Sequence, residues 1–369
     1  MSAVDAVDRF QRKHAIIGFP LAVVYKYFDD QGPYLGAIIT YYAFIAIFPL
    51  LLISSSVLGF ILQNDPGLSD RLINTALSQF PIIGDQLGRP EGLKGSTTAI
   101  VIGTFTALYG ALGLGQACQN AAHVAWSVPR NSRANPISMR LRSLVFLATG
   151  GLGVLTVAVL TSVLANTDAF GTTFSQDVNR YIRIAGFLVS IVVFMGLFRL
   201  VSGSRGTWLN VLPGAILTAA LWQTLQLAGQ AYVSGVINRA SQMNSTFALV
   251  LGLLAFVFIA AMMGVVGLEV NVVAARHLYP RALLTPFTDN VDLTAADQRA
   301  YEAYAKSQRH KGFQSVTVRF EPHKDEATAD HTSPVVEPVL PAPDPAPAPA
   351  PVVTSDDASR RDDATQRDV

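Results

Sequence analysis

Charged side chains are scarce where this chain is most hydrophobic. Of its 369 residues, 50% are hydrophobic and only 14% are Asp, Glu, Lys or Arg, whereas a soluble domain has about 25% charged residues. Six long apolar runs hold only two of these charged residues, Arg199 and Glu269. The runs are Ala37–Ile61, Thr97–Gln116, Ser143–Ala165, Ile184–Val201, Leu209–Val233 and Thr246–Ala274.

The length of these runs predicts the environment of the chain. A helix rises about 1.5 Å per residue, so about 20 residues cross a hydrocarbon core of about 30 Å. All six runs meet or approach that length. The sequence therefore predicts an all-α fold, a polytopic membrane bundle of six transmembrane helices over residues 37–274.

Residues that support several kinds of chemistry are also missing. Cys118 is the only cysteine, so no intramolecular disulfide can form. The six histidines are scattered, there is no GxxxxGK[ST] stretch, and no HExxH or nucleophile–base pair occurs. We therefore expect no enzyme activity, no metal, no cofactor and no ATP drive.

The segments outside the bundle differ in character. Residues 1–36 carry Arg9, Arg12, Lys13 and Lys26 beside apolar and aromatic residues, which predicts a cytoplasmic, interfacial amphipathic segment whose basic residues face lipid phosphates. Residues 275–311 are predicted to hold a polar helix, because Thr294 precedes Asp297 at capping-box spacing. Residues 312–369 are rich in Pro and Ala and predict a disordered tail, which either docks a partner or acts as a solvated spacer.

The basic residues predict an orientation. Lys and Arg concentrate in the N-terminal segment, in the loops after the second and fourth runs, and after the sixth run. Positive charge stays in the cytoplasm, so we expect a multi-pass protein of the cell inner (plasma) membrane with both termini cytoplasmic. Membrane lipids are the expected partners, nucleic acid is not, and a homo-oligomer is left open.

Polar residues within the runs are the candidate site, because every polar group in lipid must find a partner. Glu269 and Asn271 either contact a cation, proton or substrate, or form a structural hydrogen bond or ion pair. We expect them to share one depth with polar residues of other helices, in a single cluster on the cytoplasmic side. The further members of this cluster are Tyr41, Tyr42, Gln116, Asn120 and Arg199.

Each of these further members also has a purely structural interpretation. The tyrosines suit an aromatic belt, the amides suit helix packing, and Arg199 can snorkel, pair with Glu269 or bind a lipid phosphate. Pro49 is expected to bend the first helix, and Pro213 with Gly214 suits the start of a helix or a kink.

Three stretches resemble a known family. "TYYAFIAIFPLLLISSSVLGF" (Thr40–Phe60), "LYGALGLGQACQNAAHVAWSVPR" (Leu108–Arg130) and the PGA…Y…G.E.N pattern of Leu212–Asn271 are similar to the YihY/BrkB/YhjD family of inner-membrane proteins. The resemblance covers about residues 15–280. On its pattern positions fall Tyr42, Pro49, Asn120, Pro213, Gly214, Tyr232, Glu269 and Asn271.

The resemblance implies six membrane helices with cytoplasmic termini and a link to envelope integrity. It favours a transporter or flippase for an envelope lipid or small amphiphile, with a cavity beside Glu269 open to the inner leaflet. The alternative is a non-transporting membrane scaffold that recruits partners through its tail. A ribonuclease label also attaches to the family, but the scattered histidines do not support a metal nuclease.

Overall fold

A computed structural model describes residues 3–61, 97–165, 176–205, 207–235, 242–283, 285 and 291–321. All of them belong to one compact unit, Met1–His323, and a second unit comprises Lys324–Val369. Residues 62–96, and the predicted tail from residue 322 onward, lie outside the described residues.

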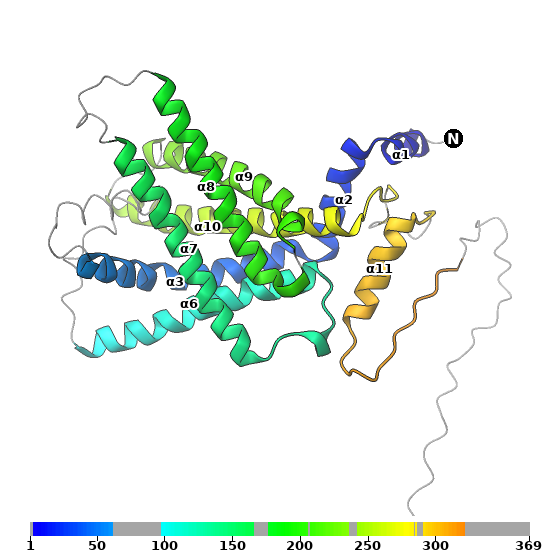
Figure 1. The fold of residues 1–369 in the computed structure, drawn as a ribbon, viewed down its shortest axis with the longest axis horizontal. Helices are drawn as coiled ribbons and strands as arrows, with labels where there is room; N and C mark the ends of the chain where they lie inside the picture. Colours follow the sequence, from blue (N-terminus) through cyan, green and yellow to red (C-terminus); the bar gives the residue numbers. More distant parts are fainter. Residues whose placement is uncertain are drawn as a thin grey trace, which may run out of the picture. The chain divides into compact units, whose positions relative to one another are not determined.

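Within the described residues all regular structure is helical, which confirms the all-α class. The helices are α1 (Ala3–Lys13), α2 (Ala15–Asp29), α3 (Gly32–Ile61), α6 (Thr97–Ala125), α7 (Pro136–Ala165), α8 (Gln176–Ser202), α9 (Trp208–Gly235), α10 (Gln242–Arg276) and α11 (Ala295–Ser307). Two short 3-10 turns, η2 (Arg130–Ser132) and η4 (Gly203–Arg205), follow α6 and α8 (Figure 1).

Four helices of the described part are long and apolar enough to cross a membrane. Their qualifying stretches are Pro136–Val157, Ile184–Ser202, Trp208–Gly235 and Phe247–Arg276, which correspond to the last four predicted runs. The described part of α3 contributes a shorter apolar stretch, Gly32–Ile47. Much of the side-chain structure of α3 and α6 falls outside the described residues, as does that of Pro49, so the predicted bend there stays a prediction.

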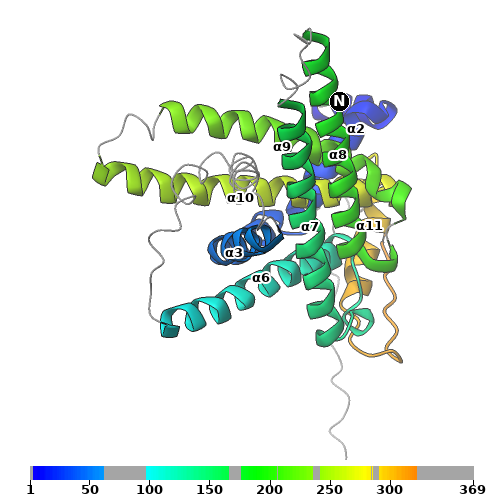
Figure 2. The same cartoon turned by 60° about the vertical axis from the view of Figure 1, so that its left-hand side comes forward.

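The bundle is held by close helix pairs. Helix α10 packs against α9 on one side and α3 on the other, and α3 packs against α6 (Figure 1, Figure 2). Small residues make these approaches close: a Cβ on Gly113 of α6 would lie 2.2 Å from the ring of Tyr42 on α3. Glycine at such contacts lets backbones approach, which is how helices associate where lipid removes the hydrophobic driving force.

The N-terminal segment forms two helices, and α2 packs on α10 and α3. The prediction that its basic residues face lipid phosphates is wrong for Lys26, whose residue surface is 1% exposed. It forms ion pairs instead with carboxylates on α10 and at the end of α2, so its charge is compensated inside the protein. Helix α3 begins at Gly32, before the first apolar run that starts at Ala37.

The turn between α2 and α3 sets this arrangement. Gln31 adopts a left-handed backbone conformation with φ 57°, and a Cβ on Gly32 would lie 2.2 Å from the ring of Tyr27. The glycine therefore lets α3 start directly beneath Tyr27. As a result the last turn of α2 lies against the bundle.

Helix α11 confirms the predicted capping box. The Thr294 side chain accepts from Asp297 N, and the Asp297 carboxylate accepts from Thr294 N. The helix ends at Ser307, within the segment 275–311 that was predicted to hold it.

Candidate functional site

The sharpest predicted residue, Glu269, lies near the end of α10 and is fully buried. Helix α2 covers it. The Lys26 ammonium lies 3.3 Å from Glu269 Oε2 and 2.5 Å from Asp30 Oδ2. We call Lys26, Asp30 and Glu269 the buried triad; their residue surfaces are at most 5% exposed.

Local sequence positions two members of the triad. Lys26 and Asp30 are four residues apart at the end of α2, so they share one face. Asp30 caps the C-terminus of α2, where the helix dipole disfavours a carboxylate and favours a cation. Lys26 therefore offsets both the dipole and the Asp30 charge.

The triad holds two carboxyl groups against one ammonium. Burial lowers the pKa of Lys26, but Glu269 and Asp30 outweigh it and leave that pKa above its ordinary value. For Asp30, burial raises the pKa, and the opposing effect of Lys26 does not cancel it. Both Glu269 oxygens lack a hydrogen-bond donor among the described groups, apart from the ion pair with Lys26. The triad therefore holds one carboxyl group more than its single ammonium can neutralise.

Tyr304 brings α11 to the triad. Its hydroxyl lies 3.5 Å from Lys26 Nζ, and its ring centroid lies 5.2 Å from the same atom. Burial, followed by the negative charge of Asp30, raises the pKa of Tyr304, so the hydroxyl stays protonated. The triad is thus closed by a neutral phenol from outside the bundle.

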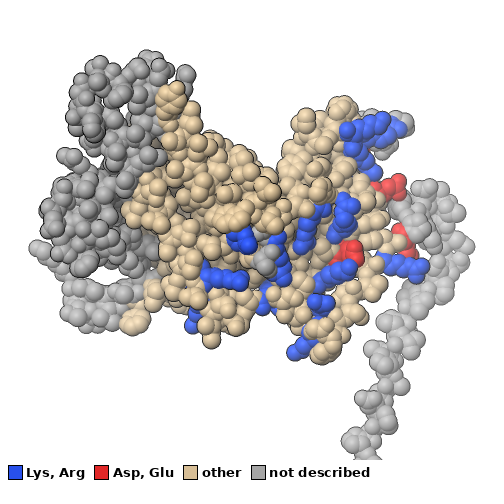
Figure 3. Space-filling model, viewed as in Figure 1, with Lys and Arg blue, Asp and Glu red and all other residues tan. Residues whose placement is uncertain are grey.

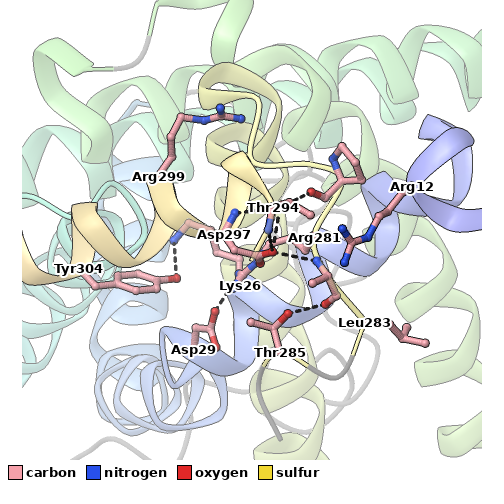
Figure 4. Close-up of polar contacts among 12 residues, drawn as sticks. Arg12, Lys26, Asp29, Arg281, Leu283, Thr285, Thr294, Asp297, Arg299 and Tyr304 are labelled. Carbon is pink, nitrogen blue, oxygen red and sulfur yellow. Dashed lines mark hydrogen bonds and ion pairs between the residues drawn. The ribbon is translucent and has the colours of Figure 1, made fainter. Parts of the chain in front are cut away.

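A second buried network ties the two ends of the described chain together. Arg281 Nε lies 2.6 Å from Asp297 Oδ1, and Arg281 Nη1 lies 2.8 Å from Asp29 Oδ2. The other Asp297 oxygen accepts from the backbone N–H groups of Ala282 and Thr294. We call Asp29, Arg281, Thr294 and Asp297 the terminal clamp (Figure 4).

The clamp also reaches α1. Gln11 Nε2 donates to Arg281 O at 2.6 Å, and Asp8 Oδ1 accepts from Leu283 N at 2.8 Å. Burial lowers the pKa of Arg281, but its bonds to Asp297 and Asp29 reverse this and raise it. The clamp therefore keeps its charge and holds α2 and α11 over the Glu269 end of α10.

Asn271 has a structural partner. Its Oδ1 accepts from Gly214 N at 2.7 Å, and a Cβ on Gly214 would lie 2.0 Å from Gly267 O. Helix α9 runs unbroken through Pro213, which lies one residue before this contact. The Pro213–Gly214 pair thus lies at a close approach of α9 to α10.

The single predicted polar cluster is not formed. Tyr41 is 59% exposed, while Asn120 Oδ1 accepts from Arg133 Nη1 at 3.3 Å and Arg199 donates to the carbonyl of Gly203. In the described part of the chain no hydrogen bond or ion pair joins these three residues to Glu269. The position of a residue along its helix did not predict the direction in which its side chain points.

The other predicted members stand apart as well. Tyr42 packs against Gly113, and Gln116 is half-buried on α6. The buried amide of α6 is instead Gln119, which donates to Met139 O and Ser143 Oγ at 2.9 and 3.0 Å. It joins α6 to α7 as a structural contact.

Sequence reasoning missed most of the functional geometry. Lys26 could have been found from its i,i+4 spacing to Asp30 beside an apolar stretch. Charged residues in such a pattern can be buried when a third group compensates the remaining charge. Arg281 offered no local signal. Within the described residues, no three His, Cys, Asp or Glu side chains group so as to hold a metal.

The ends of α6, α8 and α10 contact one another at one end of the bundle. Trp126 Nε1, after α6, donates to Ser202 Oγ at 3.0 Å at the end of α8. Arg276 Nη2, at the end of α10, donates to Trp126 O at 2.7 Å, and Arg309 Nε reaches Asn131 Oδ1. Lys and Arg side chains gather toward the part of the visible face that carries α11 (Figure 3).

These features define an integral membrane protein. Several long apolar helices form the bundle, a cap of polar helices covers one end, and buried charges lie where the two meet. The chain belongs to the BrkB family: the family model described as "Virulence factor BrkB" matches residues 23–289. This confirms the resemblance found in the sequence. The match contains the whole buried triad and Arg281, but it ends before α11. Neither a curated protein nor a solved structure matches the chain.

Proposed function

We propose that this protein crosses the inner (plasma) membrane six times and keeps both termini in the cytoplasm. Helices α3 and α6 have 30 and 29 residues, and at about 1.5 Å per residue each is long enough to cross a hydrocarbon core of about 30 Å. At one end of the bundle, the N-terminal helices contact the segment after α10, and the ends of α6, α8 and α10 contact one another. An even number of spans places both termini on the same side of the membrane, and the positive-inside rule assigns that side to the cytoplasm.

The function that the site supports best is transport of an envelope lipid or small amphiphile, coupled to a proton or small cation at the buried triad. The single observation that carries this proposal is the excess of buried acid at Glu269. Apolar side chains in place of a buried ion pair are often neutral or stabilising, so such a pair is weak support for stability alone. An ionisable residue at membrane depth defaults to a functional role.

The covering of Glu269 indicates how coupling would work. In this structure the carboxylate is shielded by α2 and, through Tyr304 and the terminal clamp, by α11. A proton or cation can reach it only when the cap moves away. Loading of the triad and movement of the cap are therefore linked in the proposed cycle.

The test uses the full chain reconstituted in vesicles of phosphatidylglycerol and phosphatidylethanolamine that carry a trace of fluorescent headgroup-labelled lipid. Lipid movement between leaflets is followed by quenching with a membrane-impermeant reductant, with and without a pH gradient. We expect the wild type to accelerate lipid movement and to respond to the gradient. Glu269→Gln should lose the response to the gradient.

The matched control is Glu321→Gln, which removes an exposed carboxylate outside the triad and away from the helix bundle. It should behave as the wild type does. A wild-type rate equal to that of empty vesicles under both gradient directions would rule out lipid transport. A Glu269→Gln protein that keeps the full gradient response would rule out coupling at the triad.

A further inference from the structure

An open groove lies at the junction of α10 and α11, separate from the triad. It has a volume of about 330 Å³, and its lining is Arg276, Leu278, Arg299, Glu302, Ala303 and Lys306. Three cationic side chains face one carboxylate, so the groove carries an excess of positive charge.

The sequence of α11 explains why one helix serves two purposes. Residues 299, 302, 303 and 306 recur at helical spacing and line the groove, whereas Asp297 and Tyr304 lie on the other face and engage Arg281 and Lys26. The buried face holds α11 in place, and the groove face remains open.

Both arginines of the groove are held in position by backbone carbonyls. Arg276 Nη2 donates to Trp126 O at 2.7 Å, and its guanidinium lies 5.6 Å from the Trp126 ring centroid. Arg299 Nη2 donates to His277 O at 2.6 Å. A guanidinium has five N–H donors, so each arginine retains donors after this contact.

These arginines have no acidic partner among the described residues: neither Arg276 nor Arg299 forms an ion pair with a carboxylate there. The acid of the groove, Glu302, pairs with Lys306, and both side chains are more than 40% exposed. An exposed pair of this kind contributes little, so an anion can displace it.

We propose that this groove binds a phosphate group, with Arg276 and Arg299 as the fixed donors and Lys306 as the mobile one. Positioned guanidiniums suit phosphate oxygens because they offer paired N–H donors in a plane. The phosphate could belong to an anionic lipid headgroup of the adjacent leaflet or to a soluble phosphate, since both present the same oxygens. Binding at this groove does not depend on transport and is measured at equilibrium.

The test is a binding titration on the full chain in a neutral detergent. The probes are short-chain phosphatidylglycerol, short-chain phosphatidylcholine and inorganic phosphate, with thermal unfolding of each variant as the folding check. Arg299→Gln/Lys306→Gln should weaken binding of the anionic probe by about tenfold or more, since each charge-assisted hydrogen bond contributes about 1.5–3 kcal/mol. Glu302→Gln should tighten it, because the competing carboxylate is gone.

The matched control is Lys311→Gln/Arg319→Gln, which removes two exposed positive charges outside the groove. It should leave affinity within about twofold, well below the factor expected for one lost charge-assisted hydrogen bond. If the groove variant weakens binding of phosphatidylglycerol and inorganic phosphate does not bind, the ligand is a lipid headgroup. If the groove variant weakens binding of inorganic phosphate, the ligand is a soluble phosphate. Equal losses in the groove and control variants, or no binding of either anionic probe, would overturn the proposal.

Discussion

Lys26 Nζ lies 3.3 Å from Glu269 Oε2, although the two residues belong to α2 and α10, which lie far apart in the chain. Asp30 completes the contact at 2.5 Å from the same nitrogen. Lys26 is one of the N-terminal basic residues that were predicted to face lipid, yet it pairs with a carboxylate of the membrane bundle.

Replacing Lys26 by Met should destabilise the protein strongly. The change leaves Asp30 and Glu269 buried without their cation, and loss of one partner from a buried pair costs about 3–5 kcal/mol. The measurement is thermal or denaturant unfolding of the detergent-solubilised full chain. Lys13→Met, at an exposed position of α1, is the control and should change little.

A second variant separates the charge effect from lost packing. Lys26→Met/Glu269→Gln removes the cation together with one acid, so it should be more stable than Lys26→Met alone. A double variant less stable than Lys26→Met would mean that the Glu269 carboxylate is not destabilising once Lys26 is gone. The triad would then be wrongly described.

Gly214→Ala should disrupt the contact of α9 with α10. Its Cβ would lie 2.0 Å from Gly267 O, which is a backbone atom and cannot rotate away. Overpacking of this kind costs about 1–3 kcal/mol. Unfolding measurements on the same detergent-solubilised chain give the value.

Gly264→Ala is the matched control for this change, because nothing lies within 4 Å of a Cβ at that position of α10. It should leave stability unchanged or raise it by up to about 1 kcal/mol, since Ala favours a helix interior over Gly. Equal losses in both variants would mean that the α9–α10 contact is not as close as described.

The pH dependence of stability should report on Asp30. Burial raises its pKa above the ordinary value of 3.8, so the folded protein holds this proton to a higher pH than the unfolded chain does. Folding then takes up a proton, and stability falls as pH rises from about 3.8 through the raised pKa. The raised pKa of Lys26 acts only above 10.5, outside this window.

Asp30→Asn should therefore flatten the profile. We expect the stability of the wild type relative to this variant to decrease with rising pH, measured as unfolding midpoints in one detergent. Asp292→Asn, an exposed change near α11, should run parallel to the wild type. A wild-type profile that instead climbs relative to Asp30→Asn would reverse the sign of the pKa shift.

The sequence by itself determined the features that depend on neighbouring residues. Helices long enough to span a membrane follow from apolar runs with very few charges, because hydrocarbon excludes ions over a fixed thickness. The capping box of α11 follows from Thr294 and Asp297, because both partners lie within one turn. Glu269 and Asn271 stood out because polar groups are rare in such helices.

Only the tertiary structure decided what each polar group meets. Tyr41 and Tyr42 are adjacent in the sequence, yet one is exposed and the other packs on Gly113. Lipid and protein neighbours are equally apolar, so periodicity does not reveal which face of a membrane helix meets another helix. The pairing of Lys26 with Glu269 and of Arg281 with Asp29 and Asp297 likewise joins helices far apart in the chain, where no local pattern carries the information.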